Sequence, residues 1–398
     1  MVESGSDQKS SNRLALVAPV IRGLLARPTG SEDIPYEPVI LRSLNSGGAV
    51  EFAGSAESAE TGQYPEPLTK GRTPPLFVEA VEFGAGAEDL RKQLSDWISD
   101  YSSKHSRKPE IVCLRGLGIV YVDRRDDSSD LPLKNKVGVV TGAAGAIGYG
   151  VCRGLLESGC YLAATDLCGE KLNAFLADLK KRGGDHVIGV PLDVTDKASV
   201  TQGFESIIQT WGGIDILVLN AGIAMVSHLK EMDLEAFRRL EKVNVEGALL
   251  TLSEVARHFI LQGTGGDIIV ISTKNVPAPG AGFGAYSATK AACHQLGRIA
   301  SVELAQYGVR VNMVAPDAVF SEGGYKSGLW EQIGPGRMQA RGLDEKGLQQ
   351  YYRDRNLLKV RVTGRHVSNA VLFFATRQTP TTGATIPVDG GLPDATPR

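Results

Sequence analysis

Residues 137–148 have the sequence VGVVTGAAGAIG, an apolar run that passes directly into a glycine-rich turn. The run Val137–Val140 predicts a buried strand, and the segment after the turn predicts a helix. Glycines at such a turn let the backbone approach a pyrophosphate, whose charge is stabilised at the helix N-terminus. The residues that we expect to bind a dinucleotide here are Gly142, Gly145, Ala146, Ile147 and Gly148. A glycine-rich strand-to-helix turn without a ligand is the alternative.

Six more apolar, β-branched runs follow this turn, and helix-length segments separate most of them. The seven expected strands are Val137–Val140, Tyr161–Ala164, Val187–Val190, Ile214–Leu219, Asp267–Ile271, Val309–Val314 and Ala384–Val388. Strands buried on both faces and joined by helical crossovers are typical of a parallel sheet with helices above and below it. We therefore predict an α/β fold over residues 131–398, a Rossmann-type, doubly wound, parallel sheet of seven strands.

The first 130 residues differ in composition and are rich in Ser, Gly, Pro and Glu. A helical pattern begins near Leu90 and continues to Ile98. Two short strands are expected at Glu110–Leu114 and Ile119–Val122, before a charged linker at 123–130. Residues 1–130 are thus predicted to form a small, partly ordered α/β remnant, and their pattern alone indicates no chemistry.

Composition and charge bear on the partners and the compartment of this protein. The 398 residues contain 43 Lys and Arg against 45 Asp and Glu, so bulk charge favours neither a nucleic acid nor an anionic membrane as partner. The five cysteines have no paired spacing, which favours free thiols in a reducing compartment. The polar start at residues 1–12 lacks the pattern of a secretory signal, and no apolar run is long enough to cross a membrane. We expect a cytoplasmic protein; an organellar presequence around Leu14–Leu25 is the alternative.

An acidic residue at the end of the second strand bears on the choice of cofactor. Asp166 lies about 20 residues beyond the glycines, where a carboxylate can bind the ribose hydroxyls of a dinucleotide. A carboxylate repels a 2′-phosphate, and the next residue is Leu167 rather than Arg, so NAD is favoured over NADP. A solvated acid at a strand end is the alternative.

Two further strand ends carry residues that we expect beside the cofactor, because ligands of open α/β sheets bind outside the carboxyl ends of the strands. These residues are Asp193, Val194, Asn220, Ala221 and Gly222. Ordinary turn chemistry is the alternative for each of them.

The most specific pattern is Tyr286-Ser287-Ala288-Thr289-Lys290 at the start of an expected helix. Tyrosine and lysine four residues apart lie on one helical face, so the ammonium of Lys290 can approach the phenol of Tyr286. A free phenol has a pKa near 10, and a nearby cation lowers that pKa toward the range that general acid–base catalysis needs.

Other polar residues extend this candidate site. The hydroxyls of Ser272 and Thr273 follow the fifth expected strand and could stabilise charge on a substrate oxygen. Asn244 lies inside an expected helix at Leu234–Leu261, where asparagine is locally unfavourable, and it could hold a water molecule. Lys274 could contact a phosphate or hydroxyl of the substrate, with a solvated surface lysine as the alternative.

On these residues, the region Leu131–Arg398 resembles a short-chain dehydrogenase/reductase. The resemblance implies that Tyr286 is the acid–base residue, that Lys290 binds the nicotinamide ribose and lowers the pKa of the tyrosine, and that Asn244 supports a proton-relay water. The position of the family's serine, thirteen residues before the tyrosine, is Thr273 with Ser272 beside it, and the middle glycine of the cofactor turn is Ala146. Thr273 keeps the hydroxyl, so activity is expected.

A closer resemblance joins segments of both parts of the chain. Ser272–Ala291, Pro316–Phe320 and Gly328–Trp330 resemble the dehydrogenase half of bifunctional rhamnulose-1-phosphate aldolase/short-chain dehydrogenase proteins, some of them assigned lactaldehyde dehydrogenase activity. Pro109–Gly118 resembles a piece of the aldolase half, which in that family is a zinc enzyme with several histidine ligands. His105 is the only histidine before residue 130, so we expect no metal site and no aldolase activity in a truncated remnant.

The sequence thus predicts an NAD-dependent oxidoreductase that acts on a small hydroxylated alcohol or carbonyl compound. The resemblance implies a lactaldehyde- or deoxy-sugar-like substrate, with Lys274 and Asp317 near it. A catalytically weak, NAD-binding regulatory protein is the alternative. The apolar content of the helices expected at Leu234–Leu261 and Ala285–Tyr307 favours a homo-oligomer, a dimer or a tetramer.

Overall fold

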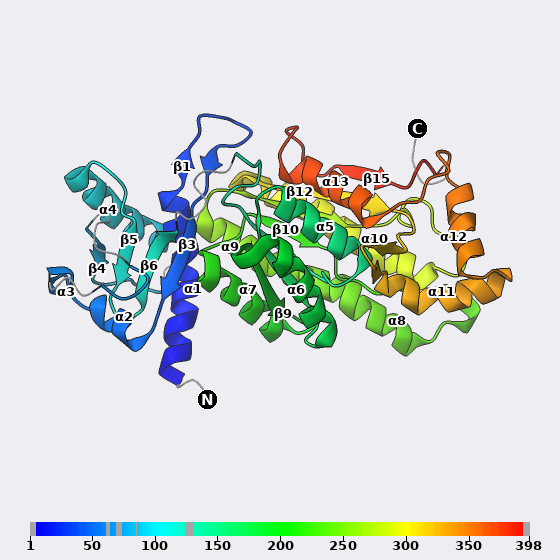
Figure 1. Ribbon diagram of the computed structural model, residues 1–398, viewed down its shortest axis with the longest axis horizontal. Coiled ribbons are helices and arrows are strands. Elements are labelled where there is room, and N and C mark those ends of the chain that lie inside the picture. Colours follow the sequence, from blue (N-terminus) through cyan, green and yellow to red (C-terminus); the bar gives the residue numbers. More distant parts are fainter. Residues whose placement is uncertain (1–4, 61–63, 69–73, 85, 124–129, 393–398) are drawn as a thin grey trace. The chain divides into compact units, whose positions relative to one another are not determined.

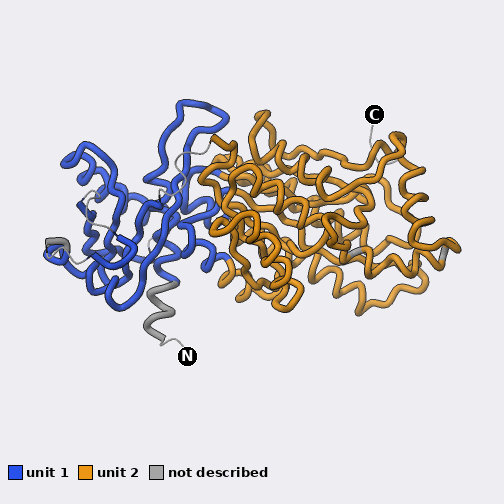
Figure 2. The backbone as a smooth tube through the Cα atoms, viewed as in Figure 1, with its two compact units in different colours: residues 1–129, 204–215, 256–265 blue, residues 130–203, 216–255, 266–398 orange. Residues whose placement is uncertain are grey.

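The computed structural model describes residues 5–60, 64–68, 74–84, 86–123 and 130–392. The chain divides into two compact units (Figure 2). The first comprises residues 1–129, 204–215 and 256–265, and the second comprises residues 130–203, 216–255 and 266–398. A single boundary at residue 130 therefore leaves out two later segments that belong to the first unit. Most of the expected linker, residues 124–129, and the start of the chain, residues 1–4, lie outside the described residues.

The second unit is built on a seven-stranded sheet in the order β15-β12-β11-β10-β7-β8-β9 (Figure 1). Every neighbouring pair of strands is parallel. The strands are β7 Val137–Val140, β8 Tyr161–Asp166, β9 Val187–Pro191, β10 Ile216–Leu219, β11 Gly266–Ile271, β12 Val309–Pro316 and β15 Thr385–Val388. The predicted doubly wound parallel sheet is confirmed, since each expected strand is present within two residues of its expected bounds at either end.

Helices cover both faces of this sheet because its strands alternate their side chains between two apolar layers. Ile269 of β11 packs in a core with residues of α5 Ala146–Glu157 and α13 Gly364–Ala375. The next residue, Val270, faces Gly297 of α10 Gly284–Glu303. The remaining helices of the crossovers are α6 Glu170–Gly183, α7 Lys197–Trp211, α8 Leu234–Glu241 and α9 Gly247–Gln262.

The long helix expected at Leu234–Leu261 is interrupted. Between α8 and α9 lies a π-helical segment, Lys242–Glu246, which contains the buried Asn244. One π-helical turn shifts the following residues around the helix axis and is frequent at functional sites. The prediction of a continuous helix was wrong here, because one inserted residue hardly changes the spacing of apolar residues in the sequence.

The chain between β12 and α13 forms an excursion at the carboxyl ends of the strands. A short hairpin, β13 Ser321–Glu322 and β14 Tyr325–Lys326, precedes α11 Gly328–Arg341 and α12 Glu345–Asp354. Ser327 caps α11 by accepting a hydrogen bond from the Trp330 amide, and Asp344 caps α12 in the same way.

The first unit has a sheet and an apolar core of its own. Its four strands lie in the order β3-β6-β5-β4, with β4 parallel to β5 and the other pairs antiparallel. Its elements are α1 Gly5–Leu25, β1 Arg27–Pro28, β2 Tyr36–Glu37, β3 Ile40–Leu44, α2 Gly47–Phe52, α3 Glu57–Glu60, β4 Leu76–Val78, α4 Ala87–His105, β5 Ile111–Leu114 and β6 Gly118–Asp123. The expected small α/β region is therefore more ordered than its composition indicates.

Candidate active site

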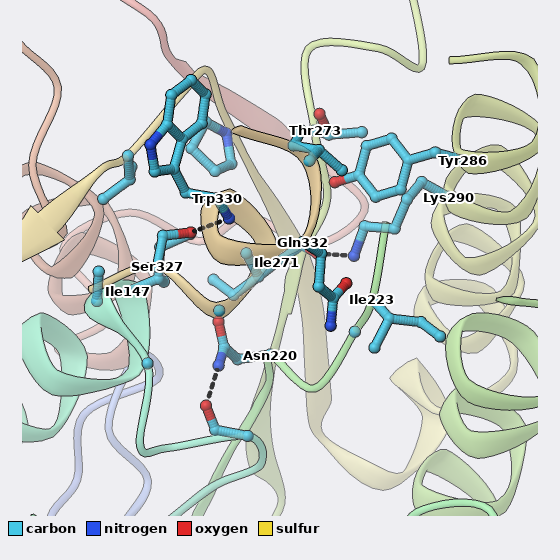
Figure 3. A pocket seen from close by; sticks show the side chains of 18 of the residues that line it. Ile147, Asn220, Ile223, Ile271, Thr273, Tyr286, Lys290, Ser327, Trp330 and Gln332 are labelled. Carbon is cyan, nitrogen blue, oxygen red and sulfur yellow. Dashed lines mark hydrogen bonds between the residues drawn. The ribbon is translucent and has the colours of Figure 1, made fainter. Parts of the chain in front are cut away.

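A cavity of about 570 Å³ lies at the carboxyl ends of the strands of the second unit, the edge at which open α/β sheets bind ligands. Its lining runs from the glycine turn after β7, past the ends of β8 to β12, to helices α11 and α12. Figure 3 shows ten labelled residues of this lining. All residues that we expected to bind cofactor, substrate or the reacting oxygen line it except Asn244, which lies directly behind the wall.

The glycine turn meets the N-terminus of α5 and leaves room for a bound group. A Cβ atom at Gly145, the residue that caps α5, would meet nothing within 4 Å, so the backbone here faces open space. Gly142 has a φ of +60°, and a Cβ there would lie 2.8 Å from the Cα of Ala221. The side-chain amide of Asn220 donates to the carbonyls of Thr141 and Gly142 at 2.9 and 2.8 Å. Asn220 thus holds the turn against the end of β10.

Asp166, at the end of β8, has its carboxylate held by two backbone amides. Ala144 N donates to Oδ2 at 2.9 Å, and Leu167 N donates to Oδ1 at 2.8 Å. The carboxylate lies in the cavity lining, beside the exposed side chain of Leu167. A negative charge is therefore positioned one strand away from the glycine turn.

Asp193 and Val194 also line the cavity, after β9. The Oδ1 of Asp193 accepts hydrogen bonds from both the amide and the hydroxyl of Thr195 at 2.8 Å, which is turn chemistry. Val194 packs closely on Gly247, since a Cβ atom added to Gly247 would lie 2.8 Å from Cγ2 of Val194. Both residues therefore shape this wall whatever else they contact.

Tyr286 and Lys290 project from the first turns of α10, where they line the cavity with Thr273 from the end of β11 (Figure 3). All three side chains are buried, with exposed fractions of 8%, 6% and 6%. The Thr273 side chain lies beside the phenol of Tyr286 (Figure 3), and its hydroxyl accepts a hydrogen bond from Asn275 N at 3.3 Å. The Lys290 ammonium donates to the Ile271 carbonyl at 2.7 Å. The spacing of four residues thus places phenol and ammonium at the same cavity, as expected.

The pKa of Tyr286 differs from the expectation. Burial raises the pKa of Tyr286 to about 12, and the hydrogen bond with Thr273 opposes that rise in part. The expected lowering by Lys290 is not what this structure has, since burial outweighs the other contributions. Burial also lowers the pKa of the Lys290 ammonium.

Asn244 is tied to the chain that follows β10. Its amide oxygen accepts from Ile223 N, and its amide nitrogen donates to Ile223 O, both at 2.9 Å. The same nitrogen donates to the Thr289 hydroxyl at 3.1 Å. A Cβ at Gly222 would lie 3.2 Å from Asn244 Oδ1 and 3.8 Å from Lys290 Nζ, so a glycine permits this close approach. The π-helical segment therefore brings Asn244 into contact with α10; its water-holding role stays a prediction.

The structure distinguishes the two neighbouring hydroxyls at the end of β11. Thr273 lies beside Tyr286, whereas the Ser272 hydroxyl lies 2.9 Å from Nδ1 of His294. Successive residues of an extended segment point to opposite sides, so only one of the two can face the phenol. The sequence analysis did not anticipate His294, although it stands one helical turn beyond Lys290.

The two expected substrate residues have partners of their own. The Lys274 ammonium lies 3.4 Å from the Ala278 carbonyl, and the Asp317 carboxylate forms an ion pair with Arg355. Both line the cavity. The negative charge of Asp317 is therefore balanced within the protein.

Helices α11 and α12 supply further residues to the cavity wall. Gln332 accepts a hydrogen bond from Ala224 N at 3.3 Å, and the ring of Trp330 packs on Phe320 at 4.3 Å between centroids. Trp330, Ile333 and Tyr352 join an apolar cluster that includes Tyr286.

The described part of the chain has three further properties. No group of three or more His, Cys, Asp or Glu side chains there could hold a metal ion. None of its helices has the length and apolarity needed to traverse a bilayer. Its five cysteines are all free thiols, as expected.

Comparison with known proteins identifies the class. Residues 136–331 match the family model for short chain dehydrogenases. Sorbitol dehydrogenase of Cereibacter sphaeroides is 34% identical over 190 residues, which are 48% of this chain and 73% of that protein. Sorbitol-6-phosphate 2-dehydrogenase of Escherichia coli is 29% identical over 65% of this chain and 98% of that protein. The chain belongs to the short-chain dehydrogenase family.

Two more comparisons concern length and fold. The uncharacterized oxidoreductase YuxG of Bacillus subtilis is 33% identical over 66% of this chain, and the match spans 38% of that protein. The crystal structure of sorbitol-6-phosphate 2-dehydrogenase from Erwinia amylovora has a TM-score of 0.59 at 28% identity, over 64% of this chain and 98% of that one. The L-sorbose reductase of Gluconobacter frateurii, solved with NADPH and L-sorbose, has a TM-score of 0.60 at 24% identity and shares the fold. These comparisons agree with the seven-stranded parallel sheet of the second unit.

Proposed function

We propose that this protein is an NAD-dependent oxidoreductase that transfers hydride between nicotinamide and a small hydroxylated alcohol or its carbonyl form. The observation that carries the proposal is that the buried side chains of Tyr286, Thr273 and Lys290 line one cavity, beside the glycine turn and Asp166. A phenol and a hydroxyl side by side in one wall can both contact the same substrate oxygen.

The residues present suit a dinucleotide. The open space at Gly145 adjoins the N-terminus of a twelve-residue helix, where backbone N–H groups favour a pyrophosphate. The carboxylate of Asp166 suits two ribose hydroxyls and opposes a 2′-phosphate, which supports NAD over NADP. When bound, the nicotinamide accepts or supplies the hydride.

The chain's own residues manage the proton and the substrate oxygen. Thr273 binds the reacting oxygen, and Tyr286 accepts the hydroxyl proton during oxidation or donates it during reduction. Lys290, which lines the same cavity, would hold the nicotinamide ribose. Asn244 would hold a water molecule of the proton relay. Trp330 and Ile333 cover the cavity with apolar surface and exclude bulk water.

The substrate class is proposed from the relatives and from the resemblance. The names of relatives include dehydrogenases of sorbitol, sorbitol 6-phosphate and D-threitol, which supports a polyol or its keto form. The resemblance to aldolase/dehydrogenase fusion proteins adds lactaldehyde-like and deoxy-sugar-like compounds. On the same resemblance, we propose that residues 1–130 are a truncated aldolase-like remnant without aldolase activity. A cytoplasmic location is proposed from the polar start of the chain and its free cysteines.

We also propose a homo-oligomer, a dimer or a tetramer. Apolar side chains on α9 and α10 are exposed in the isolated chain: Leu249 by 49%, Ile299 by 44% and Val302 by 78%. Contact with a second copy would remove these side chains from water. Light scattering on the full-length protein checks this, and a monomer at all concentrations would contradict it.

One experiment tests the proposed activity. The purified full-length chain is mixed with NAD, or separately NADP, and with a panel of polyols and 2-hydroxyaldehydes, while reduced nicotinamide is followed by absorbance. The expected result is turnover with NAD that Tyr286→Phe abolishes. Tight NAD binding without turnover on the whole panel would instead support a regulatory protein.

A further inference from the structure

We propose that the substrate end of the cavity binds an anionic group, a phosphate monoester or a carboxylate, and that Arg337 is its main partner. This inference rests on the proposed function, because it places the anion on the same hydroxylated substrate that Tyr286 would oxidise or reduce.

Arg337 is a buried cation for which the described residues supply no hydrogen-bond acceptor or carboxylate partner. It lies on α11 in the cavity lining and is 9% exposed. Its Nε atom is buried with no hydrogen-bond partner, and no carboxylate in the described part of the chain pairs with it. A buried, unpaired charge is costly, and its cost falls when a ligand of opposite charge binds. The neighbouring Arg355 differs, since Asp317 already balances it.

Arg337 is also close to the reaction site. Its guanidinium carbon lies 4.9 Å from the centre of the Phe283 ring, and that ring lies 6.2 Å from the ring of Tyr286. One aromatic ring thus separates the cation from the acid–base residue. Stacking over a ring leaves the N–H groups in the guanidinium plane free to donate. A substrate whose carbinol contacts Tyr286 can therefore extend a substituent a few carbons away to Arg337.

The surrounding charge favours an anion. The basic residues of the cavity lining are Lys171, Arg239, Lys274, Lys290, Arg337, Arg341 and Arg355, against three carboxylates. One of these carboxylates, Asp317, forms an ion pair with Arg355. The other two acids of the lining, Asp166 and Asp193, stand at the ends of β8 and β9 on the dinucleotide side. Arginines match the geometry of phosphate and carboxylate oxygens, and a cleft lined by one sign of charge concentrates the opposite one.

The test uses matched substrates and three variants. Wild type, Arg337→Gln, Arg337→Lys and Lys346→Gln are assayed with a neutral hexitol, its 6-phosphate and the corresponding aldonate. Lys346 is an exposed lysine on α12 outside the cavity lining, so Lys346→Gln removes one charge from the same region as a control. Thermal unfolding of each variant checks that it is folded.

We expect kcat/KM to be higher for one of the two anionic substrates than for the neutral hexitol. Arg337→Gln should lower the ratio of these two kcat/KM values by about 10- to 100-fold. Arg337→Lys keeps the charge and should restore part of the ratio, whereas Lys346→Gln should leave it as in wild type. A preference for the 6-phosphate identifies a phosphate as the anion, and a preference for the aldonate identifies a carboxylate. Equal kcat/KM for all three substrates, or equal losses in Arg337→Gln and Lys346→Gln, would overturn the proposal.

A second measurement separates this inference from the proposed function. Inorganic phosphate should raise the melting temperature of wild type and Lys346→Gln more than that of Arg337→Gln, whether or not any substrate is turned over. Turnover of neutral polyols without a phosphate effect at Arg337 would retain the dehydrogenase and reject the anion site. The phosphate effect without turnover would retain the anion site and reject the proposed substrates.

Discussion

Arg22 in the first unit and Arg337 in the second are both buried, yet their surroundings are opposite. The Arg22 side chain is 1% exposed and donates to Val39 O, to both carboxylate oxygens of Asp215 and to Gln262 Oε1, at 2.7 to 3.1 Å. Arg337 has an aromatic ring beneath it and no acceptor in the described part of the chain.

The difference separates two uses of buried polarity. A buried ion whose hydrogen bonds are all made within the protein stabilises one arrangement of the chain and has little left to offer a ligand. A buried polar group that faces a cavity retains donors or acceptors for something that binds there. We therefore expect substitutions around Arg22 to change stability and substitutions around Tyr286 to change activity. Four predictions test that separation, from the largest expected effect to the smallest.

Tyr286→Phe should lower kcat by about 10²- to 10⁴-fold, because it removes the general acid–base and leaves the ring in place. The affinity for NAD, measured by fluorescence titration, should change little, and so should the melting temperature. Steady-state kinetics in both directions measure the loss. A loss below about tenfold would place the proton transfer elsewhere.

Arg22→Met should reduce the free energy of unfolding by about 3–5 kcal/mol, because the carboxylate of Asp215 stays buried without its guanidinium partner. Denaturant unfolding of the full-length chain measures this, and KM for the substrate should not change. The double variant Arg22→Met/Asp215→Leu should recover part of the loss. An equal decrease in the free energy of unfolding in Arg337→Gln and Arg22→Met would contradict the expected difference between the two arginines.

Asp166→Ala should lower kcat/KM for NAD by about 10- to 100-fold, since the ribose loses a charge-assisted hydrogen bond. The value for NADP should fall less or rise, because the repulsion of its 2′-phosphate is removed. The measured quantity is the ratio of the two values. Asp166 also accepts hydrogen bonds from two backbone amides, so we expect a modest decrease in melting temperature as well. This residue should therefore contribute to both activity and stability.

Thr273→Ala should move the pH profile of alcohol oxidation to higher pH by about one unit or less. The hydrogen bond from Thr273 lowers the pKa of Tyr286, so its loss raises that pKa and leaves less phenolate at any pH below it. Oxidation needs the phenolate and should slow, whereas reduction uses the protonated phenol and should be less sensitive. Thr273→Ser should restore the profile. An unchanged profile in Thr273→Ala would mean that another group sets this pKa.

Much of the fold was predictable because it depends on local pattern. The apolar runs indicate a parallel sheet without any knowledge of contacts, and β7, β8, β10, β11 and β12 are indeed buried along most of their length. The spacing of Tyr286 and Lys290 likewise places them on one helical face. The break at Lys242–Glu246 was not predictable, because a single extra residue in a helix leaves the apolar spacing almost unchanged.

The pKa of Tyr286 could not be predicted in direction either. A cation one turn away favours a lower value, yet the depth of burial decides the balance, and burial depends on Trp330, Ile333 and the rest of the covering cluster.

The sequence by itself determined the strands, the glycine turn with Asp166, and the tyrosine and lysine on one helix, since each depends on residues near one another in the chain. Only the tertiary structure decided that Thr273 rather than Ser272 meets Tyr286, that Arg22 meets Asp215 193 positions away, and that Arg337 meets no carboxylate in the described chain. The reason is that periodicity records which side of an element is buried, whereas the partner of a buried polar group depends on how distant elements pack.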